Sequence, residues 1–138
     1  MVELSLEYWN ELAHQLLLIN SLLSGFSIAI VANLLVDKSK RPIVINILKI
    51  STIAAGCFLI AVFALFKIIM MTTNGYPLEV VENDLTLPRI IGALAFFLGT
   101  ISLSAIISLA GWTKSKSTGI FTTVVGFLTL VGIMLMLF

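Results

Sequence analysis

One uncharged stretch, residues 15–36, constrains this chain more than any other feature. A helix over it would be roughly 33 Å long at about 1.5 Å per residue, enough to cross a hydrocarbon core about 30 Å thick. The stretch nevertheless contains several hydrogen-bonding side chains: Asn20, Ser21, Ser24, Ser27 and Asn33. Because polar groups inside lipid need partners or water, we interpret it as the functional helix of a polytopic membrane protein.

Composition supports a membrane protein and excludes several other classes. Only 11% of the 138 residues are charged, against about 25% in a soluble domain, and the mean hydropathy is +1.14. The single cysteine, Cys57, lies in an apolar run, so neither a disulfide framework nor a cysteine metal site is expected. A net charge of +1 without a basic tract gives no indication of nucleic-acid binding. We predict no cofactor and no bound metal.

The apolar runs predict an all-α protein with four transmembrane helices in a single domain, residues 1–138. The expected spans are residues 15–36, 47–71, 89–112 and 119–138, preceded by an interfacial helix over residues 1–14. The interfacial helix is expected because Glu3, Glu7 and Glu11 recur every four residues. Thr86 and Pro88 offer a start for the third helix. Small residues four apart, Ser104 with Ser108 and Thr122 with Gly126, predict close helix packing.

The basic residues predict an orientation. The side that holds loops 37–42 and 113–118 carries six of them, whereas the other side carries two, Lys67 and Arg89. Since positive residues favour the cytoplasmic side, both loops are expected in the cytoplasm, with the protein in the plasma (inner) membrane. The six are Lys38, Lys40, Arg41, Lys49, Lys114 and Lys116.

Two opposite faces of the first span are candidates for a path through the membrane. One is a polar stripe of Asn20, Ser24 and Ser27, which could line a water-filled path. The other, about 180° away, is mainly apolar and could form a constriction that gates by dewetting and ends in an amide. It comprises Leu18, Leu22, Phe26, Ala29 and Asn33. In a third interpretation, the polar groups only bond to neighbouring helices.

The first span resembles the first transmembrane helix of the Orai calcium-channel family. The likeness covers residues 22–26, Leu-Leu-Ser-Gly-Phe, followed by small and apolar residues and then Asn33 and Asp37. Residues 93–100, Ala-Leu-Ala-Phe-Phe-Leu-Gly-Thr, with residues 112–114, Trp-Thr-Lys, are similar to the family's third span. The four spans and their spacing also agree with the family.

The resemblance implies a homo-oligomeric ring in which the first spans surround a central pore. By position, Asn33 replaces the family's selective glutamate, Phe26 matches its pore-facing aromatic residue, and Leu22 and Ala29 complete the apolar constriction. An amide ring lacks the carboxylate field that holds a divalent cation, so calcium selectivity is not implied. The family's basic inner pore has no counterpart here. The family also keeps both termini in the cytoplasm, which disagrees with the orientation that the basic residues predict.

These features favour a non-enzymatic membrane protein. The only histidine, His14, lies at the membrane edge, and the loop acids have no histidine or cysteine partner. A proton-coupled exporter would need an ionisable group at membrane depth, which residues 15–36 lack. We therefore predict a small ion-channel-like homo-oligomer with a mainly hydrophobic pore. Such a protein could act as a bacterial membrane-permeabilising effector that is controlled by an unidentified protein or ligand. The alternative is a non-conducting accessory or assembly subunit of a larger membrane complex.

Overall fold

The computed structural model describes residues 5–137, without the side chain of Glu82, and is entirely helical. The helices are α1 (Leu6–Val36), α2 (Pro42–Thr72), α3 (Glu82–Ala110) and α4 (Lys116–Leu137), with a short 3-10 turn, η1 (Gly111–Thr113). All four α-helices are long and apolar enough to cross a membrane, which confirms the predicted all-α fold with four potential membrane spans. Glu3, in the expected interfacial helix, and residue 138, the end of the expected fourth span, lie outside the described residues.

The α1 helix runs without a break from Leu6, within the expected interfacial segment, through the first span. The Ser5 hydroxyl caps its first turn by accepting a hydrogen bond from the Tyr8 N–H at 3.2 Å. Its 31 residues make a helix roughly 46 Å long, which exceeds the hydrocarbon thickness. One or both ends of α1 must therefore emerge from the membrane core.

The connection between α2 and α3 turns at Gly75, whose φ of 94° lies in the left-handed region that favours glycine. The α3 helix then begins at Glu82, earlier than the Thr86–Pro88 start that the sequence offered. The Asp84 carboxylate explains this early start, because it accepts a hydrogen bond from the Val81 N–H at 3.1 Å and stabilises the first turn. Pro88 consequently lies inside the helix.

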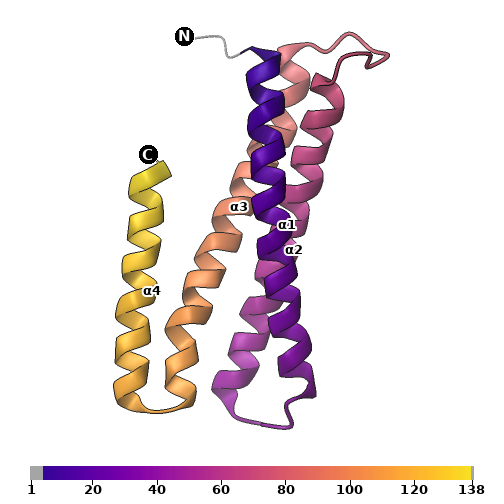
Figure 1. Cartoon of the computed structure of the whole chain (residues 1–138). Helices are drawn as coiled ribbons and strands as arrows, with labels where there is room; N and C mark the ends of the chain where they lie inside the picture. Colours follow the sequence, from indigo (N-terminus) through magenta and orange to yellow (C-terminus); the bar gives the residue numbers. More distant parts are fainter. Residues whose placement is uncertain (1–4, 138) are drawn as a thin grey trace.

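The helices form an open array in chain order. α1 packs along α2, α2 packs along α3, and α4 packs on α3 and η1. In Figure 1, α4 stands beside the lower part of α3, away from α1 and α2. The buried core lies among the first three helices, where Ala54 and Phe58 of α2 pack with Ile106 of α3 and with side chains of α1. α1 is therefore an edge helix, and most of its opposite face is exposed.

Close contacts between small residues join α3 to α4. A side chain at Gly126 would collide with the Ser108 hydroxyl and lie 2.9 Å from the Ser104 carbonyl oxygen. The Thr122 hydroxyl donates a hydrogen bond to the Ser108 carbonyl at 3.1 Å, and the Trp112 indole donates one to the Thr123 hydroxyl at 3.0 Å. The small residues on α3 and α4 therefore do allow the close packing that their spacing predicted.

Candidate pore helix and neighbouring crevice

The polar stripe of α1 points into the protomer. Asn20, Ser24 and Ser27 are all buried, and Asn20 has an exposed fraction of only 1%. The Asn20 Nδ2 group and the Ser27 hydroxyl donate hydrogen bonds to carbonyls one turn earlier in α1, each at 2.8 Å. The Asn20 Oδ1 atom and the Ser24 Oγ atom have no hydrogen-bond partner. The stripe therefore belongs to the helix-packing side of α1.

The surroundings of this stripe are apolar. Leu23, Ile30 and Leu34 of α1 pack against the cluster that contains Ala54 and Phe58. Such close-packed side chains favour a packing role for the buried polar residues over a water-filled path within one protomer. The hydrogen bond from the Ser27 hydroxyl to a carbonyl of its own helix is the arrangement expected of a serine in a lipid-embedded helix.

The four residues predicted to line a pore lie on the exposed side of α1. Leu22, Phe26, Ala29 and Asn33 are all exposed, and Phe26 has an exposed fraction of 66%. The structure therefore brings them together on one face of an edge helix, opposite the buried stripe. In a membrane, such a face meets either lipid chains or another protein surface.

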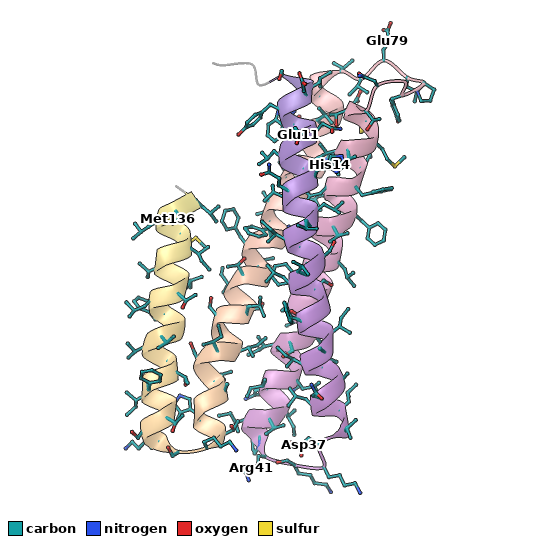
Figure 2. The ribbon with its side chains drawn as sticks, in the orientation of Figure 1. Glu11, His14, Asp37, Arg41, Glu79 and Met136 are labelled. Atoms are coloured by element: carbon teal, nitrogen blue, oxygen red, sulfur yellow. The ribbon has the colours of Figure 1, made fainter. Side chains whose placement is uncertain are left out.

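The two basic loops lie at the same end of the molecule. The Arg41 guanidinium donates a hydrogen bond to the Thr113 carbonyl at 3.1 Å, which joins the loop after α1 to the turn after α3. Figure 2 shows Asp37 and Arg41 at this end, whereas Glu11, His14 and Glu79 lie toward the opposite end. Among residues 5–137, no three histidine, cysteine or acidic side chains come together in a way that could hold a metal ion.

A crevice opens beside the polar stripe, at the end of the molecule remote from the basic loops. Its volume is about 290 Å³, and α1, α2, α3 and the last turn of α4 line it. Asn20 lies in its wall, and Trp9 and Arg89 lie in it nearer the helix ends. The Arg89 guanidinium carbon sits 3.9 Å from the centroid of a Trp9 ring, in a cation–π contact.

The sequence alone does not reveal this crevice. Trp9 and Arg89 are far apart in the chain, and in the sequence Arg89 is recognisable only as a charge beside the third span. One feature of the sequence points toward it. An aromatic residue lies near the start of α1 and a basic residue near the start of α3, and an antiparallel topology places these two helix starts at the same end of the molecule. Their contact depends on helix rotation, which the sequence did not specify.

No protein-family model matches the chain, and no curated protein or solved structure matches it. The resemblance to the Orai family thus stays a prediction from short motifs.

Proposed function

We propose that the protein is a small homo-oligomeric, ion-channel-like membrane protein, with the first helices of several copies surrounding the pore. One observation supports this proposal most directly: α1 buries its polar stripe and leaves Leu22, Phe26, Ala29 and Asn33 on the free face of an edge helix. A ring of copies would cover that face and bring the four residues to its axis.

The chemistry of this face defines the kind of pore. Rings of Leu22 and Phe26 would make an apolar neck that excludes water when narrow and conducts when it widens. Asn33 would add a ring of neutral amides, which binds cations weakly because it has no net charge. We infer a weakly selective pore, closed at rest and opened by a regulatory protein or ligand. A bacterial membrane-permeabilising effector of the inner membrane, with loops 37–42 and 113–118 in the cytoplasm, fits these properties.

Ion flux into liposomes that contain the purified protein tests the proposal. Phe26→Lys should increase flux, because a charge in a dewetted neck draws water into it. Phe127→Lys is the matched control, since Phe127 on α4 has an exposed fraction of 65% and lies about as far from the basic-loop end as Phe26. Asn33→Trp should block the flux through the Phe26→Lys pore. Variants are compared only when their size-exclusion profiles and helicity match the native chain.

Equal flux from the Phe26→Lys and Phe127→Lys variants would contradict a pore along the exposed face of α1. Flux that Asn33→Trp leaves unchanged would contradict the position of Asn33 on the path. The same preparation also gives the particle mass in detergent, which a ring predicts to be several times that of one chain.

The half of α4 beyond Gly126 favours a second candidate, a non-conducting accessory subunit. Phe127, Leu128 and Leu135 are exposed there, and within residues 5–137 α4 packs mainly on α3 and η1. Such a helix could dock on another membrane protein. This candidate predicts a monomer or dimer after extraction and no flux from the Phe26→Lys variant, so the experiment above separates the two.

A further inference from the structure

The crevice between α1 and α3 has the features of a lipid site. It has a volume of about 290 Å³, near the lower end of ordinary ligand pockets, and its lining is overwhelmingly apolar. Along α1 it extends from Trp9 to Asn20, a distance of roughly 16 Å at about 1.5 Å per residue. It is therefore an elongated slot parallel to the helices, bordered by the exposed Ala93 and by Phe96 and Phe97 of α3.

The position of this slot restricts what can fill it. Its walls offer water few polar partners, since most of the lining side chains are aliphatic or aromatic. A whole helix, about 10 Å across, would not fit in so small a volume. Because the surrounding solvent at this depth is hydrocarbon, an acyl chain is the occupant that matches the slot in both shape and polarity.

The Trp9–Arg89 pair gives the slot a charged end. Trp side chains settle at the headgroup level of a membrane, and Trp9 lies in the first turns of α1. Stacking on the indole ring holds the Arg89 guanidinium at the end of the slot, with its Nε atom buried. A guanidinium held at this level complements a phosphate, with which it can form charge-assisted hydrogen bonds.

We propose that this crevice binds one phospholipid molecule, with its phosphate at Arg89 and one acyl chain along the slot toward Asn20. The bound lipid would lie between α1 and α3, which otherwise share few contacts. It would therefore brace the edge helix α1 against the rest of the protein. The site is independent of whether the protein conducts ions.

Lipid binding to the purified full-length chain in detergent tests the proposal, with native mass spectrometry as the readout. Two probes with the same acyl chains are compared: dioleoylphosphatidylglycerol, which carries the phosphate, and dioleoylglycerol, which lacks it. The native chain should retain the phospholipid about tenfold more tightly, the effect of one or two hydrogen bonds to a charged group. Arg89→Gln should abolish this preference.

Two further variants distinguish recognition of the phosphate by Arg89 from binding of the acyl chain in the slot. Lys67→Gln removes a positive charge from a different groove, the one between α2 and α3 lined by Phe63 and Leu87, and should leave the preference intact. Ala93→Phe should fill the slot and weaken the binding of both probes, because a large ring would occupy the volume of the acyl chain. The helicity and elution volume of each variant confirm that it is folded.

Three outcomes would overturn the proposal. Equal retention of the two probes by the native chain would show that Arg89 recognises no phosphate. An equal loss of preference in the Arg89→Gln and Lys67→Gln variants would mean that the headgroup is attracted only by general charge. Unchanged binding to a folded Ala93→Phe variant would place the acyl chain outside the crevice.

Discussion

At the scale of single residues, the most informative feature is the burial of Asn20 and Ser24 beside apolar side chains. Each has one oxygen without a hydrogen-bond partner, and an unsatisfied buried polar atom costs about 1–3 kcal/mol. The sequence shows that these residues share one face of α1, but it leaves two opposite faces of α1 as candidates for lining a path through the membrane. The choice between the faces is made by packing against α2, whose Ala54 and Phe58 belong to the core cluster that contacts Leu23 of α1. The periodicity of α1 alone contains no such information.

Replacement of Asn20 tests this account. Asn20→Leu should stabilise the protein by about 1 kcal/mol, because it removes the unpaired Oδ1 atom and keeps the volume of the side chain. Ser27→Ala is the comparison, since the Ser27 hydroxyl bonds only to its own helix and its loss should change little. Thermal unfolding in detergent, followed by circular dichroism, measures both. A destabilised Asn20→Leu variant would mean that the Oδ1 atom is hydrogen-bonded in the membrane protein.

At the scale of helices, the sequence predicts the existence of the four long α-helices more reliably than their ends, and it gives no indication of the short turn η1. Thr86 and Pro88 suggested a helix start, but the hydrogen bond from Val81 to Asp84 begins α3 earlier. Proline is tolerated near a helix N-terminus and does not mark the start by itself. The small residues of α3 and α4 were better guides, because close approach between helices depends mainly on side-chain size.

The contact between α3 and α4 at Gly126 leads to a prediction at this scale. Gly126→Val should destabilise the α3–α4 hairpin by about 1–3 kcal/mol, because the new side chain would collide with Ser108 and with the Ser104 carbonyl. Gly132→Val is the control, since a side chain at Gly132 would meet nothing within 4 Å. Limited proteolysis of the turn between α3 and α4 measures the opening of the hairpin. Equal cleavage rates in the two variants would contradict this role for Gly126.

At the scale of the whole molecule, the sequence predicted four antiparallel membrane helices, and the structure adds that they form an open array. Chain order sets this array, since each helix packs mainly on the next one. Its openness could not be predicted, because apolar residues cover almost every face of α4 and do not specify which face a neighbour should contact. The Trp9–Arg89 contact was hidden for a related reason: it depends on the relative rotation of α1 and α3.

Because the array is open, the position of α1 in an oligomer decides whether its exposed face lines a pore. If several α1 helices surround an axis, equivalent residues on their exposed face come close together, whereas outward residues of α2 stay apart. Leu22 and Ile53 suit a comparison because each has an exposed fraction of 57%. In a Cys57→Ser background each chain has one thiol, so oxidation of the membranes can join chains only in pairs. Leu22→Cys should give disulfide-linked dimers, and Ile53→Cys should stay mainly monomeric. Disulfide-linked dimers from Ile53→Cys alone would place α2, not α1, between the copies and would refute a pore lined by Leu22 and Phe26.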